Sequence, residues 1–216
     1  MSLNQKALLK AITEAKEKSK KRKFTQSIEL ILSLRNLDIK SAQGRIDETV
    51  ELPHVPDEQN KIFFAASGEL ALKAKKAKVD FIIDRIELER IAGKKKELRK
   101  LANNYDYFIA EVSLMPLVAR VLGPALGPRG KRPVPVPPTA DVKEIIAKHR
   151  KAITIRARNQ PIVQCRIGTE SMKAEAVVEN IQTVIRTVER KLKNGIKDIK
   201  EAYVKTSMGS PVKIVS

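Results

Sequence analysis

Apolar and polar residues alternate in the stretch "SIELILSLR" at residues 27–35. The same isoleucines and leucines would also suit one face of a short helix, but the β-branched content and the short length favour a strand. A strand places Ser27 and Glu29 together on its solvated face. A second alternating run, "RIDETVELP" at residues 45–53, is expected to pair with this strand.

A lysine-rich helix is predicted ahead of these strands, over residues 4–22, because its apolar residues recur on one side. The run "KSKKRK" at residues 18–23 ends this helix. A run of this kind is typical of a solvated face.

The pattern changes at about residue 60, where apolar strands alternate with helices. Strands are predicted in "KIFFAAS", "VDFIID" and "YDYFIAEV", and helices over residues 68–77, 84–102, 115–123 and 139–150. Continuous apolar strands separated by helices indicate a small α/β unit with a mostly parallel sheet.

Alternation returns after residue 152. The stretch "AITIRARNQPIVQCRIG" is expected to form two paired strands that turn at "NQP". The polar side chains of this pair would share one basic face, made of Arg156, Arg158, Gln164 and Arg166. An amphipathic helix over residues 174–193 and two strands around the turn "SMGSP" complete the chain.

These changes of pattern predict one domain built from both ends of the chain and a second domain inserted within it. We place the discontinuous α+β domain at residues 1–58 and 154–216, and the inserted α/β domain at residues 59–153.

Composition adds a strong positive charge. The 216 residues include 43 Lys+Arg against 25 Asp+Glu, which gives a formal net charge of +18. Such an excess costs folding energy through self-repulsion and indicates a polyanionic partner, while the 42% apolar content is that of a globular protein. Because there is no long uncharged apolar run and no apolar signal core, we expect a cytoplasmic protein that does not enter a membrane.

Residues typical of enzymes and metal sites are scarce. The single Cys165 cannot form an internal disulfide, and His54 and His149 have no neighbours in a metal-ligand or triad pattern. We therefore expect no catalytic residue, no metal and no cofactor. The carboxylates near predicted strand ends do not complete a phosphotransfer site: Asp80, Asp84 and Asp106.

The stretch "GPALGPRGKRPVPVPP" at residues 123–138 presents a basic cluster among glycines and prolines: Arg129, Lys131 and Arg132. It is not a phosphate-binding P-loop, because Gly130-Lys131 is followed by arginine and the prolines have no N–H to donate. We interpret it as an ordered, stiff loop, which serves either as a structural turn or as a contact for a polyanion.

The stretch "KTSMGSPVKI" at residues 205–214 combines hydroxyls, a flexible apolar side chain and a small residue. Thr206 and Ser207 offer hydroxyls, Met208 offers an apolar contact, and Gly209 permits close backbone approach. This set suits the shallow minor groove of RNA, although a plain hairpin turn explains the same residues.

Together "LGPALGPRGKRPVPVPP" and "TSMGSPVKI" resemble the family of the first large-subunit ribosomal protein, which builds the mobile stalk beside the tRNA exit site. The form "GPRGK…PVPP" is similar to its archaeal branch. The likeness extends through "KFTQSIEL", "RIDETVELPH" and "MKAEAVVENI". Where the family usually has methionine before the proline, this chain has Arg132.

The resemblance implies a terminal α+β sandwich, an inserted Rossmann-like domain and a hinge between them. It implies that the terminal domain carries the principal large-subunit rRNA site, at Phe24, Ser27, Glu29, Thr206, Ser207, Met208 and Gly209. Residues that match a more variable part of the family pattern are Gly168, Thr169 and Ser171.

The function that follows is that of a non-enzymatic, ribosome-associated rRNA-binding protein, monomeric when free. The resemblance further implies contact with exit-site tRNA during its release, and repression of translation through binding to its own mRNA. A general nucleic-acid-compacting protein is the alternative, and it would bind all sequences with similar affinity.

Overall fold

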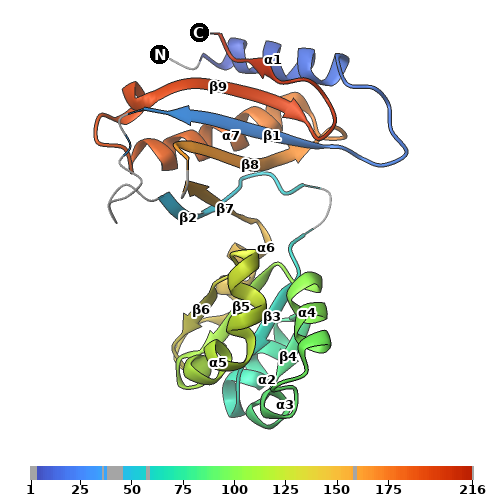
Figure 1. The fold of residues 1–216 in the computed structure, drawn as a ribbon, viewed down its shortest axis with the longest axis vertical. Coiled ribbons are helices and arrows are strands. Elements are labelled where there is room, and N and C mark those ends of the chain that lie inside the picture. The colour runs from blue at the N-terminus through green and yellow to red at the C-terminus, as the bar shows by residue number, and fades with distance from the viewer. Residues whose placement is uncertain (1–3, 36, 38–45, 57–58, 158–159, 216) are drawn as a thin grey trace. The chain divides into compact units, whose positions relative to one another are not determined.

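The computed structural model describes residues 4–35, 37, 46–56, 59–157 and 160–215. The chain divides into two compact units (Figure 1). The terminal unit comprises Met1–Glu58 and Lys151–Ser216, and the inserted unit is Gln59–Arg150. The chain therefore re-enters the terminal unit at residue 151, ahead of strand β7 (Ala152–Ala157) and not within it at residue 154.

The terminal unit is built on a four-stranded antiparallel sheet in the order β10-β9-β1-β8. Its strands are β1 (Ser27–Leu34), β8 (Ile162–Thr169), β9 (Ile199–Thr206) and β10 (Val212–Lys213). The predicted alternation of β1 is confirmed, because every second residue from Ile28 to Leu34 is buried while Ser27 and Glu29 lie on the partly exposed face.

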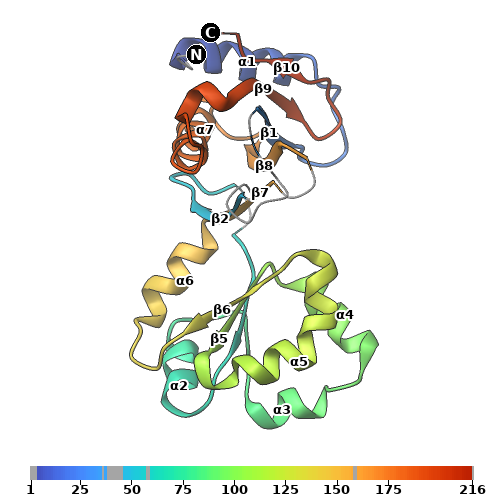
Figure 2. The same ribbon diagram turned by 60° about the vertical axis from the view of Figure 1, so that its left-hand side comes forward.

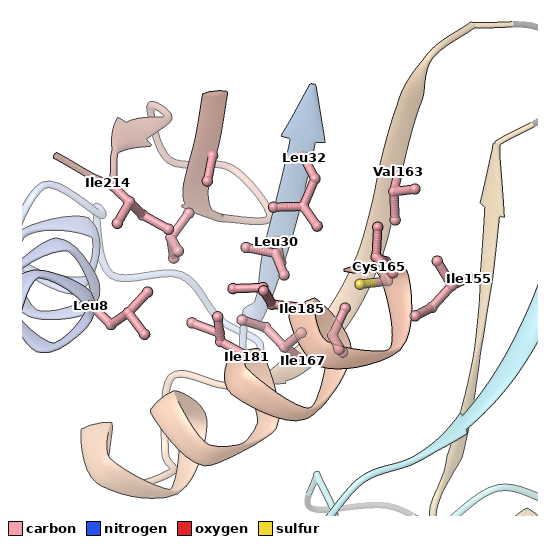
Figure 3. Close-up of a cluster of buried hydrophobic side chains, with 14 of the residues drawn as sticks. Leu8, Leu30, Leu32, Ile155, Val163, Cys165, Ile167, Ile181, Ile185 and Ile214 are labelled. Carbon is pink, nitrogen blue, oxygen red and sulfur yellow. The ribbon is translucent and has the colours of Figure 1, made fainter. Parts of the chain in front are cut away.

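Helices α1 (Gln5–Glu17) and α7 (Ala174–Glu189) contribute the other side of this core. Figure 3 shows Leu8 of α1 and Ile181 and Ile185 of α7 converging on Leu30 of β1. Helix α1 begins after Asn4, whose side chain accepts a hydrogen bond from the Lys6 N–H. Both helices are shorter than predicted at their C-terminal ends.

Two strand pairings expected from the sequence are wrong. Strand β2 (Ile46–Glu51) does not pair with β1, and β7 does not pair with β8 by hydrogen bonds. Instead β2 and β7 pair with each other as a separate antiparallel two-stranded sheet. Alternation identifies a strand and its buried face, but the partner depends on contacts between distant segments that leave no local pattern.

The inserted unit has the predicted parallel sheet, in the order β4-β3-β5-β6. Its strands are β3 (Ile62–Ala65), β4 (Phe81–Ile83), β5 (Tyr107–Glu111) and β6 (Pro133–Val136). Helices α2 (Gly68–Lys76) and α6 (Val142–Arg150) cover one face, and α3 (Arg85–Arg90), α4 (Lys95–Asn104) and α5 (Met115–Leu126) cover the other (Figure 2).

Burial on both faces explains why these strands are continuously apolar. Phe63 and Phe108 pack toward the three-helix face, while Phe64 and Ile109 pack toward α2 and α6. The sequence-based fold class, an α+β terminal part with an inserted Rossmann-like part, is confirmed.

The glycine- and proline-rich stretch is more regular than expected. Helix α5 continues past Gly123 and through Pro124 to Leu126, and a 3₁₀ turn at Gly127–Arg129 follows it. The "PVPV" segment is strand β6, and proline is tolerated there because β6 lies at the edge of the sheet. The predicted helix over 84–102 is in fact α3 and α4, separated near Gly93, which has a φ of 82°.

Within the described part of the chain, no helix has both the length and the apolar character needed to cross a membrane.

Candidate nucleic-acid interface

Three strands that are far apart in the sequence meet at one edge of the terminal unit: β1 begins there, and β8 and β9 end there. Strand β1 begins at Ser27, which lies opposite Thr169 at the end of β8. On the other side of β1, Ile28 lies opposite Thr206 at the end of β9. The structure therefore brings together the predicted residues from the "KFTQSIEL", "IGTES" and "KTSMGS" stretches.

The turn after β9 is fastened to the start of β1. The Ser207 N–H donates to the Ser27 carbonyl oxygen at 3.0 Å, and the Ser27 N–H donates to Ser207 Oγ at 3.1 Å. The Gly209 N–H donates to the Thr206 carbonyl at 3.1 Å. A Cβ on Gly209 would lie 2.3 Å from Thr206 Oγ1, so this tight turn requires glycine.

Gln26, which the sequence analysis did not single out, connects the segments around this point. Its side chain is fully buried. The amide nitrogen donates to Ser19 Oγ at 2.7 Å and to the Lys20 carbonyl at 3.1 Å, while the amide oxygen accepts from the Met208 N–H at 3.2 Å. The Gln26 N–H also donates to Glu170 Oε1 at 3.1 Å, and the Glu170 N–H donates to the Gln26 carbonyl at 2.9 Å.

No local signal marks Gln26, because a glutamine ahead of a strand is ordinary. Its role depends on the turn after β9 and on the β8–α7 connection, which lie more than a hundred residues away in the sequence. We name the residues that meet here the strand-end surface: Phe24, Ser27, Glu29, Ser171, Ser207, Met208 and Gly209.

Two apolar side chains of the strand-end surface are exposed. Phe24 is 55% exposed and Met208 is 63% exposed. Because the Met208 N–H is bound to Gln26, the backbone that carries this side chain is fixed. Their exposure leaves both apolar side chains accessible to a binding partner.

Three predicted contact residues are buried, and the expectation that Thr206 offers its hydroxyl outward is wrong. Thr206 is 0% exposed, and its Oγ1 donates to Ser19 Oγ at 3.0 Å. Thr169 is 2% exposed, with its Oγ1 2.8 Å from Ser171 Oγ. Gly168 is buried against Met172. These residues hold the strand ends in place.

The basic face expected along β7 and β8 forms only in part. Gln164 and Arg166 are exposed on β8, and the Gln164 amide donates to Glu29 Oε2 at 2.8 Å. Arg156 belongs to the other sheet, where its Nε binds Asp47 Oδ1 at 3.0 Å. The predicted contact Arg158 lies outside the described residues.

The side chains of Arg129 and Lys131 bind other parts of the inserted unit. Arg129 Nε donates to Asn103 Oδ1 at 2.7 Å. Lys131 Nζ donates to the carbonyls of Ala102 and Tyr105, at 2.9 and 2.5 Å, and burial lowers the pKa of this amine. The interpretation of this stretch as a structural turn is thus favoured for Lys131, whereas Arg129 and Arg132 are exposed.

The remaining titratable residues have structural environments. Cys165 is buried in the core, and burial raises the pKa of its thiol to about 12. Asp80 and Asp106 accept backbone N–H groups at the start of β3, and Asp84 caps α3. Among residues 4–215, where the structure describes them, no group of three or more His, Cys, Asp or Glu residues could hold a metal ion.

Comparison with known proteins gives a consistent result over nearly the whole chain. Residues 14–210 match the model of the ribosomal protein L1p/L10e family. The chain is 44% identical to large ribosomal subunit protein uL1 of Methanothermobacter thermautotrophicus, covering 98% of this chain and 100% of that protein. It is 47% identical to uL1 of Hyperthermus butylicus, covering 96% of this chain and 95% of that protein. It is 42% identical to uL1 of Archaeoglobus fulgidus, covering 100% of each chain.

Proposed function

Because this chain belongs to the ribosomal protein L1p/L10e family, we propose that it is a structural rRNA-binding protein of the large ribosomal subunit. The observation that carries the proposal is the strand-end surface. Segments from both ends of the chain converge there, with Met208 exposed on the turn that Ser207 Oγ bonds to the Ser27 backbone, and with Phe24 exposed just ahead of β1.

The chemistry of this surface favours a folded RNA over an unstructured polyanion. Aromatic and methionine side chains contact unstacked bases, and serine hydroxyls reach ribose 2′-hydroxyls at short range. The turn that carries Ser207 and Met208 is fixed by backbone hydrogen bonds, so its shape is set before binding. A fixed surface costs less conformational entropy on binding and discriminates among RNA shapes.

Positive charge supports binding without specifying a sequence. The formal net charge of +18 favours association with any nucleic acid through counterion release. We propose that Arg166 and the other exposed cations position the RNA, while the strand-end surface selects it.

Two finer parts of the proposal follow the family. The inserted unit would contact tRNA leaving the exit site through Arg129 and Arg132, the exposed cations of its basic cluster. The free protein would bind an RNA fold in its own mRNA that resembles the ribosomal site, and would thereby repress translation.

A gel-shift titration tests the principal site. Phe24→Ala and Met208→Ala should each weaken binding to the stalk rRNA fragment by roughly fivefold or more, since a lost base contact costs about 1–3 kcal/mol. Binding to random RNA of equal length should change little.

The matched control is Ile162→Ala. Ile162 is an exposed apolar residue on β8, 39% exposed, and it lies opposite Ser33, at the far end of β1 from Ser27. It should leave both affinities unchanged. Equal affinity of the unaltered protein for stalk and random RNA would contradict the proposal and support a general compacting protein.

A further inference from the structure

We propose that the basic segment Lys20–Arg22 is a fixed phosphate-binding arm of the RNA interface, held in place by Ser19 and Gln26. This inference rests on the proposed function, and it assigns to the lysine run a role other than that of a solvated face. The partner is the sugar-phosphate backbone of the RNA that the strand-end surface contacts.

The arm is anchored at Ser19, the residue directly before it. Ser19 Oγ accepts two hydrogen bonds, from Gln26 Nε2 at 2.7 Å and from Thr206 Oγ1 at 3.0 Å. Both donors come from fully buried residues. A lysine run that only coats a helix would not need two buried side chains directed at the serine within it.

The backbone of the arm is anchored as well. The Lys20 carbonyl accepts a hydrogen bond from Gln26 Nε2 at 3.1 Å, and the same amide group binds the Met208 N–H through its oxygen. One buried side chain therefore ties the arm to the turn of the strand-end surface. The backbone of Lys20 and that of the exposed Met208 are consequently held in a fixed relation to each other.

The side chains of the arm are directed to solvent. Lys20, Lys21 and Arg22 are all exposed. Lys21 and Arg22 line an open pocket of about 540 Å³. Its other lining residues are Lys16, Glu17, Ser19 and Glu170.

Two charged residues of this pocket already bind other parts of the protein, namely Glu170 and Lys16. Glu170 is already engaged, because its two oxygens accept from the Gln26 N–H and the Gln26 amide. Lys16 Nζ donates to the Met172 carbonyl at 2.5 Å, so it serves the fold. Within the arm, the exposed charges that face an external anion are those of Lys20, Lys21 and Arg22, opposed by Glu17.

The contribution of such an arm can be measured from the salt dependence of RNA affinity. Each phosphate neutralised adds about 0.9 to the slope of log affinity against log salt concentration for a duplex, and about 0.7 for a single strand. The arm should therefore contribute about 2 to 3 to this slope. It should contribute equally for specific and random RNA, because phosphate contacts carry no sequence information.

The test is the salt dependence of RNA binding by the full chain with Lys20→Gln, Lys21→Gln and Arg22→Gln combined. These substitutions keep Ser19, Gln26 and the backbone that they bind. We expect the slope to fall by about 2 to 3 on both the stalk rRNA fragment and random RNA, with the ratio of the two affinities retained.

The matched control combines Lys193→Gln, Lys197→Gln and Lys200→Gln. These lysines are exposed in the same unit, around the start of β9, whereas the strand-end surface lies at its end, and the change in net charge is identical. The control should leave the slope nearly unchanged. Equal slopes for the two triple variants would overturn the arm. A loss of slope with the first variant, in a protein that does not prefer stalk RNA, would support the arm and contradict the proposed function.

Discussion

At the scale of single residues, the candidate site depends on side chains whose roles differ from their predicted ones. Thr206 was predicted as a contact and is instead an internal support, while Gln26 was not singled out and connects the whole surface. Both are polar and fully buried, which is costly unless every polar group has a partner. A buried, fully bonded amide therefore indicates that the position of what it binds matters.

Gly209 gives a prediction at this scale. Gly209→Ala should destabilise the terminal unit and weaken specific RNA binding, because the new methyl group would collide with Thr206 Oγ1. Thr206→Ala removes that oxygen, so the double variant should cost less than the sum of the two single changes, by roughly 0.5 kcal/mol or more. The measurement is the free energy of unfolding of the four proteins in a double-mutant cycle.

A suitable control is Gly127→Ala. Apart from the adjacent backbone of its own chain segment, no atom of the described residues lies within 4 Å of the place that the added methyl group would occupy, and Gly127 has a helical φ of −54°. This change should therefore be nearly neutral. Strict additivity of Gly209→Ala and Thr206→Ala would show that the steric explanation is wrong.

At the scale of elements, the basic loop after α5 stabilises a neighbouring helix. Lys131 Nζ binds the carbonyls of Ala102 and Tyr105 at the C-terminal end of α4, where helix carbonyls have no partner within the helix itself. A cation there also interacts favourably with the helix dipole. The same lysine that looks like a polyanion contact in the sequence thus fastens α4 to the start of β6.

Replacing this lysine should loosen α4. Lys131→Met keeps the length of the side chain but removes its donors, so amide hydrogens in the last turn of α4 should exchange faster, by a factor that corresponds to about 1–3 kcal/mol. Lys100→Met, at an exposed position on α4, is the control and should leave this exchange unchanged. Unaltered exchange at the end of α4 in the first variant would contradict the capping role.

At the scale of the whole molecule, the two units have separate hydrophobic cores. The core of the terminal unit joins α1, α7 and both of its sheets, while two further clusters lie on either side of the parallel sheet. Unfolding of the chain therefore need not be a single two-state transition, and stability is best measured for each unit.

A substitution that leaves a small cavity in the terminal core tests whether the two units unfold independently of each other. Ile181 is fully buried in the terminal core, so Ile181→Val should destabilise that unit by about 1 kcal/mol. Hydrogen exchange followed by mass spectrometry should show faster exchange in peptides from residues 4–35 and 160–215. Peptides from residues 59–150 serve as the internal control, and an equal increase there would show that the units unfold together.

The sequence by itself determined most of the elements and their division between a terminal and an inserted part. Periods of two and of 3.6 residues identified β1, β8, α1 and α7, and continuous apolar strands predicted the parallel sheet. These features are local, because each residue's burial follows from the geometry of its own helix or strand. The motifs that contain Phe24 and Met208 also placed the predicted RNA site at the start of the first strand and in the last turn.

Only the tertiary structure decided which strands pair and which polar residues face water. The pairing of β2 with β7, the burial of Thr206 and the bonds of Gln26 to Glu170 and Met208 all join segments that are far apart in the chain. The physical reason is that a buried hydroxyl or amide is stabilised by its partners and not by its neighbours in sequence. The same residue types can therefore serve as RNA contacts or as buried structural residues, and long-range packing decides which.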